Sequence, residues 1–149
     1  MKLSNVKGIM AAVIAASTMM TTVHAAGVSC PTAADVKDSS KALNAVIRQS
    51  QKSFFVLSAQ PAITSSDLGW IVLTQSSSTG FDAAFNTGTN DVKSVTLAAM
   101  DKPIEQQGMY ICAYFTATGG MNVMAVAPQQ TGLIFNPAKL NLETIKPQG

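Results

Sequence analysis

The stretch GMYICAYF, residues 108–115, combines strand-forming aromatic and apolar residues with a cysteine that stands between two tyrosines. On an extended strand, side chains two positions apart share a face, so we expect Tyr110, Cys112 and Tyr114 on one face. The apolar side chains between them are expected on the other face. The Tyr-Cys-Tyr face is therefore either a ligand site or the surroundings of a structural disulfide, and the rest of the sequence must decide between them.

Residues 1–25 have the three parts of a secretory signal peptide. Two lysines supply the positive charge, GIMAAVIAA supplies an apolar core, and VHA at residues 23–25 supplies a cleavage site. The apolar run is too short to span a bilayer. We expect cleavage after Ala25, with Ala26 as the alternative. Residues 26–149 would then form a single domain, secreted or periplasmic, of a Gram-negative bacterium, without a transmembrane segment.

Removal of the signal peptide leaves a chain poor in catalytic residues. The 10 basic residues lose two lysines and then balance the 8 acidic ones, and the single histidine, His24, also leaves. Without histidine, a nucleophilic triad lacks its usual base. No basic cluster indicates nucleic-acid binding, and no cluster of metal ligands or glycine-rich phosphate loop is present. We therefore predict a binding or interaction protein, not an enzyme, with no metal and no obligatory cofactor.

Two cysteines remain in the mature chain, Cys30 and Cys112. An even count in an exported chain favours a disulfide. Closing a loop of about 80 residues would stabilise the fold by about 4 kcal/mol in the chain-entropy model. The alternative is a lipoprotein that carries its lipid on Cys30. That alternative lacks the leucine that usually precedes such a cysteine, and the apolar core of the signal peptide ends early.

The hydrophobic pattern predicts an α+β fold. Thr32 and Asp35 suggest the start of a helix, and Val36, Leu43 and Ile47 continue one helical stripe, so we predict a helix over 33–49. About five short strands follow, with a hairpin across Gly119-Gly120. The strands are predicted at 53–59, 69–75, 92–99, 109–116 and 122–127, residues 81–85 are a helical turn or a strand edge, and residues 86–91 are a loop. The prediction is one N-terminal helix packed on an antiparallel sheet and pinned by one disulfide.

Several of these features together resemble a known family. The signal peptide is followed by Cys30-Pro31, then by a Gly69-Trp70 strand and a late Ile111-Cys112-Ala113-Tyr114 strand. This set is similar to small secreted proteins of intracellular gamma-proteobacteria, most of them uncharacterised, one branch of which is called hemin-binding protein. The resemblance implies export, one small disulfide-bonded, virulence-associated domain and a role in acquiring haem iron.

Hemin binding would need an iron ligand and apolar walls. Haem iron is held by His, Met, Cys thiolate or Tyr, and here the tyrosines and methionines remain. Tyr110 and Tyr114 resemble the iron-ligating tyrosine pair of bacterial surface haem receptors of immunoglobulin-like fold, and Trp70, Phe54 and Phe55 could form the walls. The other candidate ligands are Met100, Met109, Met121 and Met124.

The same aromatic residues also fit a plain core around a disulfide, and for the Tyr-Cys-Tyr face we expect that simpler interpretation. Hemin would then be held mainly by apolar surface, with a methionine or no axial ligand. The competing hypothesis is a secreted interaction protein without a small-molecule ligand, which acts on a host or envelope protein through a sheet edge or an apolar patch.

Overall fold

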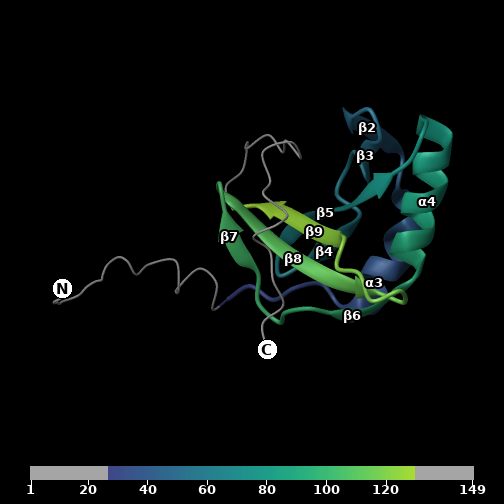
Figure 1. Ribbon diagram of the computed structural model, residues 1–149. Coiled ribbons are helices and arrows are strands. Elements are labelled where there is room, and N and C mark those ends of the chain that lie inside the picture. Colours follow the sequence, from purple (N-terminus) through teal and green to yellow (C-terminus); the bar gives the residue numbers. More distant parts are fainter. Residues whose placement is uncertain (1–26, 130–149) are drawn as a thin grey trace, which may run out of the picture.

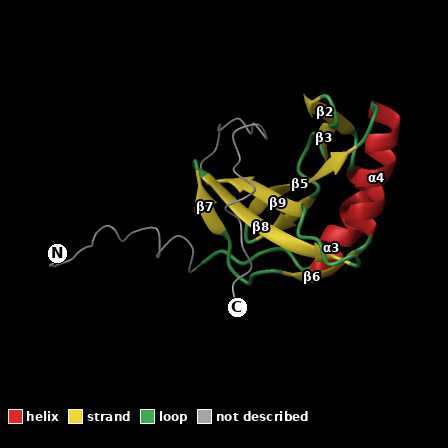
Figure 2. Ribbon diagram, in the orientation of Figure 1, coloured by secondary structure: helices red, strands yellow, loops and turns green. Residues whose placement is uncertain are grey.

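The computed structural model describes residues 27–129. The predicted signal peptide and an apolar patch at 133–135 lie outside these residues. Within this range, two α-helices, a 3-10 helix and eight strands follow one another (Figures 1 and 2). They are α3 (Ala33–Asp38), η2 (Ser39–Ala42), β2 (Ala45–Ser50), β3 (Ser53–Leu57), β4 (Ile63–Ser65), β5 (Leu68–Ser77), α4 (Phe81–Lys93), β6 (Val95–Ala98), β7 (Ile104–Gln106), β8 (Met109–Thr116) and β9 (Val123–Pro128).

The predicted N-terminal helix begins as expected but is much shorter. The Thr32 hydroxyl accepts a hydrogen bond of 3.1 Å from the backbone N–H of Asp35 and so caps α3. The helix then tightens into η2 and stops, and the second half of the predicted helix is strand β2. Val46 and Ile47 are β-branched residues that suit a strand, and they pair with Val56 and Phe55 of β3. The prediction of one helix to residue 49 was therefore wrong.

The longer helix, α4, lies in the middle of the chain, where the sequence suggested at most a helical turn followed by a loop. Its buried side is made of small residues, Ala84, Gly88 and Val92, spaced four apart. A Cβ atom on Gly88 would lie 2.7 Å from Cβ of Val56, so the glycine lets the helix approach the sheet closely. This stripe has little hydrophobic signal of its own, which explains why the loop prediction for 86–91 failed.

The eight strands form an antiparallel sheet in the order β2-β3-β5-β9-β8-β6, with β4 paired to β5 and β7 paired to β8. The predicted hairpin of β8 and β9 is confirmed, and Cys112 stands opposite Ala125. The sequence prediction of about five strands missed β2, β4 and β7. The last two are only three residues long and are joined to their partners by two-residue turns, in which Ser66, Asp67, Gln107 and Gly108 all have positive φ.

The two faces of the sheet belong to different clusters of buried side chains. We call the first the helix face, because Val36 of α3 and Ala84 and Val92 of α4 belong to the same buried cluster as Cys112 and Tyr114. Figure 1 shows α4 running beside the β2, β3 and β5 end of the sheet, with α3 near the lower end of α4. We call the second the methionine face. Its buried residues are Phe55, Leu57, Leu73, Ala99, Met100, Met109, Ile111, Ala113, Met124 and Val126.

The broad prediction of an antiparallel sheet with helices and one disulfide is confirmed. Within residues 27–129, no helix has the length and apolar character that crossing a bilayer requires.

Candidate functional site

A disulfide joins Cys30, just before α3, to Cys112 in β8, and confirms the predicted pairing. The two Cα atoms are 5.7 Å apart across a sequence separation of 82 residues. The backbone N–H of Cys30 also donates a hydrogen bond of 2.9 Å to the carbonyl oxygen of Asp101. Disulfides of this kind persist in oxidising compartments, which is consistent with a place outside the cytoplasm. The bond also occupies the sulfur atom that lipidation of Cys30 would modify.

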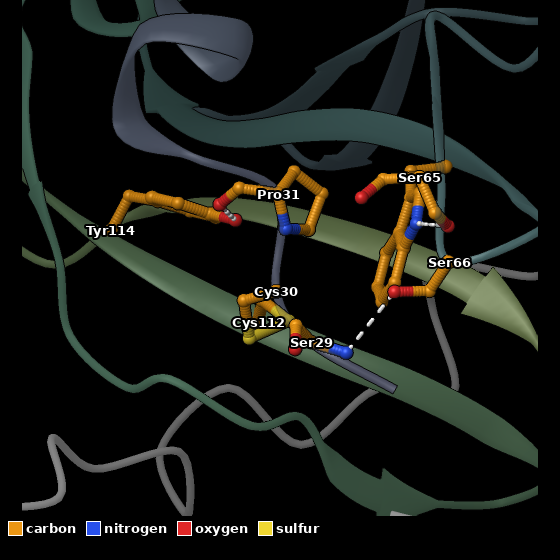
Figure 3. The surroundings of a disulfide bond; sticks show 8 residues. Ser29, Cys30, Pro31, Ser65, Ser66, Cys112 and Tyr114 are labelled. Atoms are coloured by element: carbon orange, nitrogen blue, oxygen red, sulfur yellow. Dashed lines mark hydrogen bonds between the residues drawn. A yellow bond between two sulfur atoms is a disulfide. The ribbon is translucent and has the colours of Figure 1, made fainter. Parts of the chain in front are cut away.

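Tyr114 lies beside the disulfide and is fully buried (Figure 3). Its hydroxyl donates a hydrogen bond of 2.6 Å to the carbonyl oxygen of Pro31, the residue that follows Cys30. Burial raises the pKa of the Tyr114 phenol well above its ordinary value, and the nearby Asp35 carboxylate raises it further. The surroundings of Tyr114 therefore favour the neutral phenol, whereas ligation of ferric iron needs the phenolate.

Tyr110 shares the helix face with Tyr114 and is also buried, with 5% of its surface exposed. Burial raises its pKa first, and the Glu105 carboxylate on the paired strand β7 raises it further, while a side-chain hydrogen bond with Gln129 lowers it. Both tyrosines thus point into the helix-covered side of the sheet, and their surroundings favour the neutral form.

The predicted apolar walls are divided between the two faces. Trp70 is fully buried on the helix face, and its indole N–H donates a hydrogen bond of 3.0 Å to the carbonyl oxygen of Ser65. Phe54 lies on the same face, whereas Phe55 points to the methionine face. The structure therefore brings Tyr110, Tyr114, Trp70 and Phe54 to one side of the sheet, but all four are buried side chains of the core.

The N-terminal segment holds this region together. The backbone N–H of Ser29 donates a hydrogen bond of 3.2 Å to the Ser66 hydroxyl, which lies in the turn between β4 and β5 (Figure 3). Together with the disulfide and the contact between Tyr114 and Pro31, this bond ties residues 29–31 to two separate parts of the sheet. The surroundings of the Tyr-Cys-Tyr stretch therefore serve to anchor the segment before α3.

The four methionines considered as iron ligands all belong to the opposite face. Met100, Met109 and Met124 are buried in the second cluster, and the half-buried Met121 packs against it. Alternation along β8 already separates Met109 from the tyrosines, and the pairing of β8 with β9 adds Met124, which stands opposite Ala113, to the same face. Thioether sulfur is a soft ligand and Met side chains adapt to irregular partners, so this face combines apolar area with candidate iron ligands.

One end of the methionine face is polar. The Gln75 side-chain amide donates hydrogen bonds of 2.7 Å to the side-chain oxygen Oε1 of Gln49 and 3.1 Å to the Ser53 hydroxyl. The Ser53 hydroxyl in turn donates to the same Gln49 oxygen at 2.9 Å. Strand alternation places Ser53 and Gln75 on the same face as Phe55 and Leu73. The sequence prediction missed this cluster, because the three residues meet only through the pairing of β2, β3 and β5.

A second feature that the sequence did not indicate is an arginine that lies over two neighbouring aromatic rings. The guanidinium carbon of Arg48 lies 4.8 Å from the centre of the Phe54 ring and 5.0 Å from that of Phe81. Phe81 is 49% exposed, and Ile47 on the same edge strand is 44% exposed. The edge of the sheet at β2 therefore presents an exposed patch of apolar and cationic character.

A shallow hollow of about 340 Å³ lies between α3, η2 and β4 and is lined in part by Asp35, Asp38 and Lys41. Among residues 27–129, no group of three or more histidine, cysteine or acidic side chains is placed to hold a metal ion. The hollow contains none of the residues that the sequence suggested for a ligand.

No family model, curated protein or solved structure matches the chain. The family resemblance suggested by the sequence motifs therefore stays a prediction, and the function has to be argued from the two faces of the sheet.

Proposed function

We propose that the protein is an exported binding protein for a flat, largely apolar ligand, and that hemin is the ligand to test first. The observation that supports this proposal best is the gathering of Met100, Met109, Met121 and Met124 on one apolar face of the sheet. We infer a binding role in place of catalysis, because the buried tyrosines and the disulfide serve to anchor the N-terminal segment.

The chemistry of hemin suits this face in two respects. Methionine thioether is one of the side chains that hold haem iron in proteins, and the apolar strands supply a wall for the tetrapyrrole. The polar cluster of Gln49, Ser53 and Gln75 at one end offers hydroxyl and amide groups to the two propionates. Because the methionine face is buried, a ligand has to displace whatever covers it.

Ligation of the haem iron by a tyrosine is less favourable in the observed geometry than ligation by a methionine. Ligation by Tyr114 would require the loss of its hydrogen bond to Pro31 and the deprotonation of a buried phenol whose pKa is raised. The two kinds of ligand also differ in the oxidation state of iron that they favour. A phenolate favours ferric iron, whereas the softer thioether favours ferrous iron, so the redox dependence of binding distinguishes them.

A hemin titration of residues 26–149 tests the proposal. We expect a saturable shift of the Soret band near one equivalent, and a complex that persists when the iron is reduced. Each of the four methionines is replaced singly by leucine, which nearly conserves volume. One replacement should weaken ferrous binding about tenfold or more, equivalent to about 1.4 kcal/mol. Loss of binding in Tyr110→Phe or Tyr114→Phe, with fold stability unchanged, would instead locate the site on the helix face.

The second candidate function is that of an interaction protein without a small-molecule ligand. It is supported by the exposed side chains at the sheet edges, Ile47 and Phe81 near β2 and the 61% exposed Leu97 on β6. Exposed apolar side chains beside an open strand edge suit recognition of an extended protein segment. Hemin uptake that never saturates and is equal in all the methionine and tyrosine variants would favour this candidate.

A further inference from the structure

Strand β2 forms one edge of the sheet, and within residues 27–129 it pairs only with β3. Figure 1 shows it at one end of the sheet, next to α4. Residues 47–50 of this strand are exposed. An edge strand turns alternate backbone N–H and C=O groups outward, where another extended chain can pair with them. The outer side of β2 is therefore open to an added strand.

The regular part of this edge is short. Residues 45–48 stand opposite residues 57–54 one by one, and an irregularity in the register follows between Arg48 and Ser50. A bulge twists an edge strand away from further pairing. An added strand can therefore pair with about four residues of β2, and Arg48 lies at the end of that stretch.

The Arg48 side chain is held in place, but no carboxylate neutralises it. Its guanidinium group lies over the rings of Phe54 and Phe81, and Nη1 donates a hydrogen bond of 3.3 Å to the backbone carbonyl oxygen of Gln51. Among the described residues it forms no ion pair. A guanidinium group has five N–H donors, so most of the donors of Arg48 can still take a ligand.

The surroundings of Arg48 add positive charge and few acids. Strands β2 and β3 contain no aspartate or glutamate, and the turn between them carries the exposed Lys52. The first turn of α4 has one carboxylate, Asp82, which is not paired with Arg48. A planar guanidinium group binds a carboxylate through two parallel hydrogen bonds. This edge is therefore complementary to an acidic side chain.

The register of β2 shows which pattern of side chains an added strand needs. Arg48 stands opposite Phe54, on the helix face, and Ile47 stands opposite Phe55, on the methionine face. Directly opposed residues of paired strands share a face. The residue added opposite Arg48 therefore lies beside the guanidinium group, whereas the residue added opposite Ile47 meets a side chain that is 44% exposed and apolar.

A second copy of the chain is a poor occupant of this edge. A two-fold axis between two copies pairs β2 with itself in antiparallel orientation and puts both Arg48 side chains on one face. In the registers centred on Ile47 or Arg48, the two guanidinium groups stand diagonally or directly opposite each other. Like charges in such positions destabilise a pair of strands, and β2 has no acid to offset them.

We propose that β2 is a docking edge for an extended segment of another protein, which places a carboxylate opposite Arg48 and an apolar side chain opposite Ile47. The backbone of β2 supplies pairing that any extended chain can use, and Arg48 selects the acidic one. This inference rests on the second candidate function and confines its interaction surface to one edge of the sheet. It does not involve hemin or the methionine cluster.

Two synthetic peptides test the proposal in an NMR titration of isotope-labelled residues 26–149. The first is a decapeptide of alternating threonine and valine with a glutamate in place of one central threonine, and the second has glutamine there. We expect the glutamate peptide to shift the backbone amide resonances of residues 45–48 to saturation. The glutamine peptide should bind about tenfold or more weakly, because it cannot form charge-assisted hydrogen bonds with Arg48.

Variants of the protein identify the group that selects the acid. Arg48→Gln should bind both peptides equally, and Arg48→Lys should keep part of the preference because it keeps the charge. Lys102→Gln is the matched control, because it removes one positive charge at an exposed position between β6 and β7. It should leave both affinities unchanged. The backbone amide spectrum of each variant shows that it is folded.

Methylation of the peptide nitrogens tests the pairing of the backbones. Only one of the two alternate sets of N–H groups in the glutamate peptide can face β2. Methylation of that set should abolish binding, whereas methylation of the other set should leave it nearly unchanged. Equal effects of the two sets would show that the peptide does not add to the sheet, and would overturn the proposal.

Three further results would also overturn it. Residues 45–48 could show no saturable shift, or the native protein could bind both peptides equally. Binding could instead be lost in Leu97→Asp and kept in Arg48→Gln, which would leave the second candidate function in place but move it to the β6 edge. Finally, sedimentation of the protein alone would count against the proposal if it showed a dimer that Ile47→Asp dissociates, because a second copy would then occupy β2.

Discussion

Tyr114 connects the centre of the sheet to the N-terminal segment through a single hydroxyl group. Tyr114→Phe should lower the free energy of unfolding by about 1–3 kcal/mol, because the buried carbonyl oxygen of Pro31 loses its donor. Urea unfolding of the oxidised protein measures the change. Tyr110→Phe is the matched control on the same face and should cost less, because its partner Gln129 is partly exposed and can bond to water. Equal losses would contradict a special role for Tyr114.

The same hydroxyl should also make the stability of the fold depend on pH under alkaline conditions. The folded-state pKa of Tyr114 is raised above its ordinary value of 10.0. The folded state therefore favours the protonated phenol. The stability that the Tyr114 hydroxyl contributes is fully present below the pKa of the unfolded chain, and it is lost as the pH rises from that value toward the folded-state pKa. The thermal stability of the native sequence should fall more steeply between neutral pH and about pH 11 than that of Tyr114→Phe. Parallel curves would mean that the phenol is not buried in solution.

Asp91, near the C-terminus of α4, carries a carboxylate in an unfavourable place. Burial raises its pKa, and the hydrogen bond of 3.1 Å from the Asn122 side chain only partly opposes this effect. The charged form is also disfavoured by the helix dipole. Asp91→Asn should therefore raise the melting temperature slightly at neutral pH, and the gain should vanish as the pH falls below the ordinary pKa of 3.8. Asp82→Asn, in the first turn of the same helix, should have the opposite sign at neutral pH.

At the scale of residues, the candidate site could be predicted from the sequence only in part. The alternation of β8 predicted that Tyr110, Cys112 and Tyr114 share a face, because period-two geometry is local. Whether that face is open could not be known, because the partner of Tyr114 is Pro31, 83 positions away. The polar cluster of Gln49, Ser53 and Gln75 could not be predicted from the sequence either, because it forms only when three strands pair.

At the scale of elements, the contact between α4 and the sheet depends on a glycine. Gly88→Ala would place a Cβ atom 2.7 Å from both Cβ and Cγ2 of Val56. We expect a loss of about 1–3 kcal/mol in the free energy of unfolding, the usual cost of overpacking a core. Thr87→Ala, at an exposed position of the same helix, should cost nothing or stabilise slightly.

A second substitution, at position 56, tests the same contact between α4 and β3 more sharply. Because the obstacles are both Cβ and Cγ2 of Val56, only glycine at position 56 removes them, so the double variant Gly88→Ala/Val56→Gly should be more stable than the sum of the two single losses allows. Thermal unfolding of the four proteins in the cycle measures this coupling. Strict additivity would mean that the helix has shifted away from β3 in the single variant.

The elements that the sequence predicted well are those whose signal is contained within one segment. Strand β8 and its hairpin with β9 were recovered because alternation and the Gly119-Gly120 turn are local features. The helix prediction failed after Asp38, because Val46 and Ile47 fit a helical stripe and a strand equally well until pairing with β3 decides. The polar stretch 86–91 became helical because tertiary contact with the sheet outweighs its weak intrinsic propensity.

At the scale of the whole molecule, the disulfide is the largest single constraint on the chain. With its ends 82 positions apart in the sequence, the bond is expected to contribute enough that Cys112→Ser should lower the free energy of unfolding by about 2–5 kcal/mol. The double variant Cys30→Ser/Cys112→Ser should lose a similar amount without gaining a reactive thiol. In the exported, non-reduced protein, alkylation should modify neither cysteine, and the mass should correspond to a chain that begins at Ala26 or Gly27. Two free thiols, or a lipid mass on Cys30, would contradict this.

The bond between Cys30 and Cys112 also sets how the protein responds to mechanical force. A pull applied at residue 27 passes through only a few residues before it meets the sulfur bridge, and the load then enters β8 directly, between β9 and the β6 and β7 edge. Both α-helices and six of the eight strands of the described residues lie inside the covalent loop and carry no tension. In the oxidised state the stretched path between residues 27 and 129 is therefore short, and reduction should lengthen it by about 300 Å. Most of the described fold is thus shielded from tension that enters through residue 27.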